Sequence, residues 1–200
     1  MEKINLNYAA IGSREATGDI RGRMTDLTYY LSKLGCQGRS GAADGMDTAA
    51  YIGAEIYADL SGDALPFTIW LPWSSFYSYE ADRFSYAYKV FSKVDEEFAE
   101  KKLIESGVCK NIKWLKENKQ GVYRLFCRNV YQIFIDEDML VDFVVYWCKE
   151  DEETRKTSGG TKIAVELARY YGVPTYNIGF EKDLYALRKK TGYDYRQRYN

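Results

Sequence analysis

Three short glycine-bearing segments carry the residue types that bind phosphate. They are Gly12-Ser13-Arg14, Ser40-Gly41-Ala42-Ala43-Asp44-Gly45-Met46-Asp47 and Ser158-Gly159-Gly160-Thr161. Each segment follows an apolar, strand-like run and precedes a helix-like run. In that arrangement glycine lets the backbone approach a ligand closely, and the N–H groups at the start of the helix point at an anion. Together the segments predict a site for a ligand that carries phosphate.

The first and third segments also supply side-chain donors. The planar guanidinium of Arg14 can chelate phosphate, and the Ser13 hydroxyl can donate to an oxygen. Ser158 and Thr161 add hydroxyls beside the glycine amides, but the segment lacks the Gly-Lys-Ser/Thr ending of a Walker loop. Two other interpretations stay open: an ordinary strand-to-helix turn for the first segment, and a flexible polar loop for the third.

The second segment is the most specific of the three. Gly41 and Gly45 permit a ligand to approach the backbone closely, and the small side chains of Ala42 and Ala43 do not obstruct it. Asp47 follows two residues after Gly45, where it either caps the helix or accepts a hydrogen bond from a ribose hydroxyl. The pattern favours a ligand site over a structural turn.

Composition narrows the class of protein. The chain has 200 residues, which suits one domain, and 28 basic against 29 acidic residues give a formal net charge of −1. The absence of histidine removes the commonest general base and the commonest metal ligand. Four cysteines without a Cys-x-x-Cys pair predict reduced thiols. We therefore expect a cytoplasmic protein with no metal, no cofactor and no membrane partner.

Apolar runs alternate with helix-like periodicity along the chain. The predicted strands are 8–11, 36–40, 67–71, 141–147 and 174–178, and the predicted helices are 19–34, 47–58, 94–118, 161–171 and a C-terminal helix around Leu184. Residues 123–135 fit either type, with helix preferred. Residues 73–88 are expected to form an irregular loop or short helix near the site, and 149–156 a solvated loop.

This alternation predicts an α/β fold: a Rossmann-like, doubly wound parallel sheet in a single domain over residues 1–192, with a polar tail at 193–200. All three glycine segments follow strands. They therefore fall at the carboxyl edge of the sheet, where ligands bind in such folds. We expect the three segments to converge there.

Several residue groups together carry a resemblance. They are Ser40-Gly41, Ala43, Gly45 and Asp47, which match a Ser-Gly-x-Ala-x-Gly-Ile-Asp signature with Met46 in the isoleucine place, and Gly12-Ser13-Arg14, Arg128-Asn129 and Ser158-Gly159. On these residues the chain resembles the SLOG superfamily, which unites the DNA-processing A (DprA, or Smf) recombination mediators with the Lonely Guy phosphoribohydrolases. The likeness spans residues 8–178 and is greatest to small DprA-like proteins of bacteriophage type.

The resemblance implies an anion-binding pocket in which Arg14 and Arg128 face the ligand, with Asn129 beside them. Two positions depart from the DNA-processing pattern. Tyr51 stands where the signature carries histidine, and Val130 replaces the basic residue that commonly follows the Arg-Asn pair. These departures weaken the expectation of DNA binding.

The Lonely Guy enzymes carry a glutamate three residues after the threonine of their glycine motif. Here that position is Ala164, and Glu166 lies about half a helical turn further round, so it should point elsewhere. Glu80, in the aromatic loop, is the substitute acid that we consider first. Whether the protein is an enzyme stays open.

Three functions remain. The first is capture of a nucleotide or nucleotide-derived ligand, such as sequestration of a nucleotide signal, with Trp73, Phe76 or Tyr79 stacked on the base. The second is hydrolysis or transfer at a nucleotide N-glycosidic bond, as in the Lonely Guy enzymes. The third is DprA-like binding of single-stranded DNA. The chain's 19 tyrosines also leave a homo-oligomer open.

Overall fold

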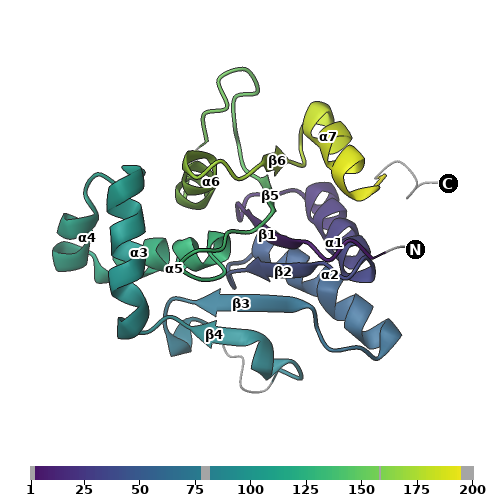
Figure 1. Cartoon of the computed structure of the whole chain (residues 1–200), viewed down its shortest axis with the longest axis horizontal. Coiled ribbons are helices and arrows are strands. Elements are labelled where there is room, and N and C mark those ends of the chain that lie inside the picture. The colour runs from purple at the N-terminus through teal and green to yellow at the C-terminus, as the bar shows by residue number, and fades with distance from the viewer. Residues whose placement is uncertain (1–2, 78–81, 158, 195–200) are drawn as a thin grey trace.

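The computed structural model describes residues 3–77, 82–157 and 159–194. Six parallel strands form one sheet in the order β4-β3-β2-β1-β5-β6, with helices on both faces (Figure 1). The strands are β1 (Asn7–Gly12), β2 (Gln37–Ser40), β3 (Phe67–Leu71), β4 (Tyr88–Val90), β5 (Phe143–Trp147) and β6 (Thr175–Asn177). The predicted single-domain, Rossmann-like α/β fold is confirmed.

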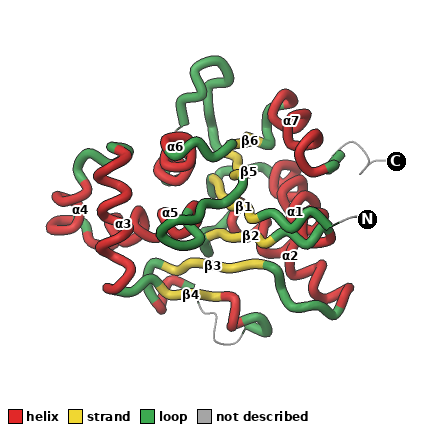
Figure 2. The backbone as a smooth tube through the Cα atoms, in the orientation of Figure 1, coloured by secondary structure: helices red, strands yellow, loops and turns green. Residues whose placement is uncertain are grey.

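The helices fall into two layers. They are α1 (Gly18–Lys33), α2 (Met46–Ser61), α3 (Lys93–Ser106), α4 (Ile112–Asn118), α5 (Gln120–Ile133), α6 (Thr161–Tyr170) and α7 (Glu181–Thr191). Helices α1, α2 and α7 cover one face of the sheet and α3 to α6 the other (Figure 2). Side chains alternate across β1, so that Tyr8 and Ala10 pack with the first group of helices, whereas Ala9 and Ile11 pack with the second. All four of these side chains are buried, which explains the continuous apolar run of a central parallel strand.

The winding direction of the sheet reverses beside β1. The chain runs outward from β1 through β2 and β3 to β4, and then returns to place β5 on the other side of β1. The register pairs Tyr8 with Phe143 and Gly12 with Trp147, so β1 and β5 end together. The crevice between their carboxyl ends is where ligands bind in folds of this kind.

Helices α1 and α2 pack unusually close together. A Cβ atom on Gly53 would lie 2.1 Å from Thr28 Oγ1 and 2.2 Å from the Thr25 carbonyl oxygen. Thr25 Oγ1 in turn donates to the Ala49 carbonyl at 2.9 Å. The small residues of α2 thus let it pack closely on α1.

The structure corrects the predicted elements in three places. The segment 73–88 contains two short 3-10 turns, as expected, but its last residue begins a strand that was not predicted, β4, which pairs Tyr88 with Ile69 of β3. The predicted helix 94–118 is two helices, because Gly107 adopts a left-handed φ of 66° and ends α3. Residues 123–135, for which helix was preferred, belong mostly to α5, which begins earlier, at Gln120, and ends at Ile133.

The predicted tail boundary also changes. Tyr193 is buried, and its ring lies 5.6 Å from that of Tyr30 on α1. Tyr193 therefore packs on the domain. Residues 195–200 lie outside the described residues.

Candidate functional site

A pocket of about 390 Å³ opens at the crevice between the carboxyl ends of β1 and β5. Residues from all three glycine segments and from α5 meet in its wall. The predicted site residues that line it are Gly12, Ser13, Arg14, Ala43, Asp47, Arg128, Asn129, Gly159, Gly160 and Thr161. Segments separated by more than 100 positions in the sequence thus converge at one edge of the sheet.

Four other predicted residues lie behind the pocket wall. Ser40 is buried and its hydroxyl donates to the Ala10 carbonyl oxygen. Gly41 is also buried, Ala42 packs against the α1–α2 core, and Gly45 has a φ of +90°. These residues shape the turn and do not line the pocket. Ser158 and Glu80 lie outside the described residues.

Asp47 ties the first two glycine turns together. Its Oδ1 accepts from the Gly12 N–H at 3.3 Å and its Oδ2 from the Ala43 N–H at 3.4 Å. Asp47 makes no side-chain cap on α2, whose N-cap is Gly45. The predicted helix cap is therefore wrong, because the carboxylate turns away from its own helix toward two strand ends.

These contacts also change the predicted phosphate cradle. The N–H groups of Gly12 and Ala43 are used by Asp47, and the Ser13 N–H donates to the Trp147 carbonyl oxygen at 2.9 Å. Only part of the amide set that we expected to face a ligand is therefore open to one. The Asp47 carboxylate and the Trp147 carbonyl oxygen occupy these other N–H groups.

Burial dominates the electrostatics of Asp47. It raises the pKa of the carboxyl to about 6, although Arg128 and the nearby backbone N–H groups oppose that change. The distance from Oδ2 to Arg128 Nη1 is 3.9 Å, so the two charges are near but not closely hydrogen-bonded. Asp47 thus changes its charge close to neutral pH.

Arg128 supplies a buried cation to the pocket. Among the described residues, none accepts a hydrogen bond from its Nε, although the residue is only 4% exposed. With the Gln132 amide oriented so that its oxygen faces donors, this oxygen accepts from Arg128 Nη1 at 3.1 Å and from the Gly41 N–H at 2.7 Å. The Gln132 nitrogen then donates to Asn129 Oδ1 at 3.1 Å. Sequence reasoning missed Gln132, because a glutamine in an amphipathic helix gives no signal of its own.

Two further arginines hold α5 in the position that aims Arg128 at the pocket. Arg39 Nη1 on β2 donates to the carbonyl oxygens of Tyr131 and Phe134, at 2.9 and 2.5 Å, at the C-terminal end of α5. Arg124 on α5 donates to the Pro72 carbonyl oxygen at 2.8 Å. A cation at the C-terminal end of a helix also stabilises it, because that end carries the negative end of the helix dipole.

The third glycine turn leads into α6, which begins at Thr161. A helix start leaves its first N–H groups without partners in the helix, and such groups attract anions. Here the Lys162 N–H donates to the Gly159 carbonyl oxygen at 3.3 Å. A Cβ atom on Gly159 or Gly160 would meet nothing within 4 Å, so this side of the pocket is open. Gly159 has a φ of +74°, which favours glycine.

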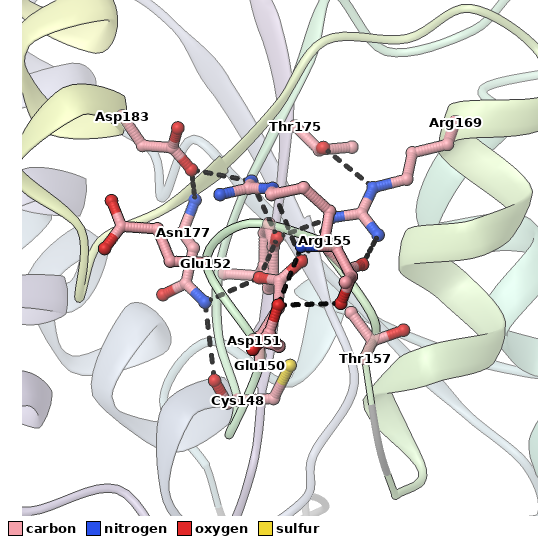
Figure 3. A network of polar contacts seen from close by, with 12 residues as sticks. Cys148, Glu150, Asp151, Glu152, Arg155, Thr157, Arg169, Thr175, Asn177 and Asp183 are labelled. Carbon is pink, nitrogen blue, oxygen red and sulfur yellow. Dashed lines mark hydrogen bonds and ion pairs between the residues drawn. The ribbon is translucent and has the colours of Figure 1, made fainter.

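The loop before α6 is anchored by a buried polar network (Figure 3). The Glu150 side chain is fully buried, and it accepts from Tyr146 Oη at 2.5 Å, Arg169 Nη2 at 2.6 Å and Asn177 Nδ2 at 2.8 Å. Arg155 lies near the other end of the loop. Its Nε is 3.4 Å from Glu150 Oε1, and its Nη2 is 2.7 Å from Asp183 Oδ2. The predicted solvated loop is thus exposed at residues 151–154, but its ends are fixed where the third glycine turn follows.

Apolar side chains form another part of the wall. Phe76, Leu125 and Phe126 line the pocket together with the polar turns. Phe76 is the aromatic residue that sequence reasoning placed near a base, whereas Trp73 packs edge-on against it at 5.2 Å and is not part of the lining. Tyr79 lies outside the described residues. Leu125 and Phe126 were missed, because their spacing on α5 is also that of core residues.

Among residues 3–77, 82–157 and 159–194, few carboxylates lie at the pocket wall. Ala164 lines the pocket, whereas Glu166 accepts from Thr157 Oγ1 at 2.9 Å and is absent from the lining. The lining carboxylates are Asp47 and Glu15, and Glu15 pairs with Lys149 at 2.9 Å.

Two general statements hold for residues 3–77, 82–157 and 159–194. No helix there has the length and apolar character needed to cross a membrane. No three histidine, cysteine or acidic side chains in the same ranges gather as metal ligands would.

Comparison with known protein families and with curated proteins gives no match. Comparison with solved structures finds DNA processing protein A from Helicobacter pylori, a protein described by its mode of binding single-stranded DNA. The two structures align with a TM-score of 0.53 over 92% of this chain and 72% of that chain, at 17% sequence identity. At that identity the likeness establishes a shared fold, and the chain is similar to a DNA-processing A protein in its architecture.

Proposed function

We propose that this protein binds a nucleotide or nucleotide-derived ligand through its phosphate, in the pocket between β1 and β5. The observation that carries the proposal is the buried guanidinium of Arg128, whose Nε has no acceptor among the described residues. A buried cationic donor without a partner is costly, and an anion in the pocket would satisfy it. The start of α6 and the exposed Arg14 add positive potential on other parts of the wall.

The apolar wall suits the remainder of a nucleotide. Phe76, Leu125 and Phe126 offer contacts to a base, while the polar turns offer contacts to phosphate and sugar. A volume of about 390 Å³ lies within the usual range for small-molecule sites, roughly 300–1,000 Å³. Phosphate donors and an aromatic wall in one pocket favour a nucleotide over inorganic phosphate.

Capture is favoured over cleavage because the described residues of the pocket wall include few acids. The position of the Lonely Guy glutamate is Ala164, and Glu166 is bonded to Thr157. Asp47 has its oxygens on backbone N–H groups. Hydrolysis of an N-glycosidic bond needs a carboxylate within hydrogen-bond reach of the sugar. We therefore rank it second.

The proposal is tested by mass spectrometry of small molecules released from natively purified protein, followed by calorimetry with purine and pyrimidine mononucleotides. An intact nucleotide is expected. A free base with a sugar phosphate would establish cleavage instead. Arg14→Ala should weaken binding about tenfold or more, since it removes a charge-assisted contact worth about 1.5–3 kcal/mol. Arg21→Ala, an exposed arginine outside the pocket lining, is the matched control and should bind as the wild type does.

A second candidate is binding of single-stranded DNA, which the shared architecture with DNA processing protein A favours. A chain of phosphodiesters could place one phosphate in the same pocket. Fluorescence anisotropy with labelled oligothymidylate tests this candidate, and an affinity that falls steeply with added salt and with Arg14→Ala would support it. Binding of mononucleotides without oligonucleotides would reject it.

A further inference from the structure

We infer that this pocket takes up its anionic ligand together with a proton, and that Asp47 carries that proton; this inference rests on the proposed function. Asp47 lines the pocket and is buried, so its charge faces the same space as the ligand. Its carboxylate occupies N–H groups of Gly12 and Ala43 at two strand ends. An ionised Asp47 therefore acts as an internal anion in a cradle for phosphate.

The contacts of Asp47 are long for a carboxylate. Its bonds to the N–H groups of Gly12 and Ala43 measure 3.3 and 3.4 Å, whereas charge-assisted bonds are usually about 2.7–2.9 Å. Arg128 Nη1 remains at 3.9 Å. The surroundings thus hold the negative charge only loosely. Burial raises the pKa of this carboxyl to about 6, which agrees with the geometry.

Among the described charged groups around Asp47, the other carboxylates are exposed to solvent. Asp47 is therefore the group whose protonation an anionic ligand should change. Arg128 faces it from α5, and Arg14 and Glu15 lie at the wall in the segment after β1. Glu15 is exposed and paired with Lys149, and Asp44, on the segment before α2, is exposed to solvent. Among the described lining residues of α6 and its preceding turn, none carries a charged side chain.

A phosphate in the pocket adds a second negative charge close to Asp47. Like charges that share a buried site favour protonation of one of them. The neutral carboxyl removes the repulsion and gains an O–H that can donate to a phosphate oxygen. Arg128 then no longer faces a charged Asp47, so its positive charge interacts with the ligand alone.

The test uses a probe whose own charge is constant. A 3′,5′-cyclic mononucleotide and a short oligothymidylate are phosphodiesters, ionised throughout pH 5.5–8. Calorimetry in two buffers of different ionisation enthalpy measures both affinity and proton uptake. We expect binding to be about 10- to 100-fold tighter at pH 5.5 than at pH 8, with uptake approaching one proton above pH 6.

Two variants identify the group. Asp47→Asn should bind with an affinity that is nearly independent of pH, and more tightly than the wild type at pH 8. Glu15→Gln, which neutralises the other carboxylate of the wall, should keep the pH dependence. Circular dichroism checks that Asp47→Asn is folded, and proton uptake by the wild type needs no variant.

The outcomes separate the two proposals. Wild-type binding with equal affinity at both pH values and no proton uptake overturns the role of Asp47 and leaves nucleotide binding intact. Persistence of the pH dependence in folded Asp47→Asn also overturns it. Failure of mononucleotides and both phosphodiester probes to bind to wild type and variant alike overturns the proposed function and this inference together.

Discussion

Replacing Gly41 with alanine should disturb both the stability of the protein and the pocket. A Cβ atom at this position would lie 1.4 Å from Arg128 Nη1 and 2.7 Å from Asp47 Oδ2, so the guanidinium has to move. Arg128 is buried and also bonded to Gln132, so it has little room to do so. Overpacking of this kind costs about 1–3 kcal/mol. For a chain of 200 residues, a loss of about 2 kcal/mol lowers the Tm by roughly 4–8 °C.

Urea unfolding followed by circular dichroism measures the first effect, and calorimetry with the nucleotide that the wild type binds measures the second. Gly18→Ala is the matched control, because a Cβ atom there meets nothing within 4 Å. If Gly41→Ala were as stable as the wild type, Arg128 could not be packed against Gly41 as described. If stability fell but nucleotide affinity did not, Arg128 would not be the cation that binds phosphate.

Three more predictions concern single side chains. The pKa of Asp47 is about 6 in the folded protein against an ordinary 3.8, so Asp47 binds more protons in the folded state between these values, and its contribution to the free energy of unfolding falls as pH rises through them. At 1.36 kcal/mol per pH unit this contribution falls by about 3 kcal/mol, and Asp47→Asn removes it, so the difference in unfolding free energy between wild type and variant should change by that amount from pH 4 to 6.5. Glu150→Ala leaves Arg155 and Arg169 without their buried partner, and thermal unfolding should show a loss of about 3–5 kcal/mol; wild-type stability would contradict the network. Ser92→Ala removes a capping box on α3 and should cost about 1 kcal/mol in urea unfolding, with no effect on nucleotide affinity.

The fold was predictable because its central strands are fully buried. The apolar runs around Tyr8 and Val144 cannot be exposed on either side, and each is followed by helical periodicity, which indicates a parallel sheet. The edge strand β4 escaped prediction for the opposite reason. It has three residues, of which Lys89 is exposed, and it is a strand because it pairs with β3. Such a strand has no pattern of its own before the sheet exists.

The site was predictable where chain direction decides position. The turns at Gly12 and Gly159 both follow strands, so a parallel sheet alone brings them to one edge. The orientation of α5 depends instead on Arg39 and Arg124, which bind carbonyl groups far away in the sequence. No local pattern shows that these arginines turn Gln132 toward the pocket. The contacts of Asp47 were equally hidden, since their donors belong to two different strand ends.

Asp47 explains how a cradle for an anion persists before any ligand arrives. Unpaired N–H groups at the ends of β1 and β2 would be costly to bury, and the turns would tend to close on them. The Asp47 carboxylate accepts from Gly12 and Ala43 and so holds the two turns in the arrangement that a phosphate would need. The cost is a buried charge, visible in the raised pKa of that carboxyl. A ligand whose binding protonates Asp47 therefore meets a preformed pocket. Arg14 and the start of α6 lie at the same wall and can contact that ligand directly.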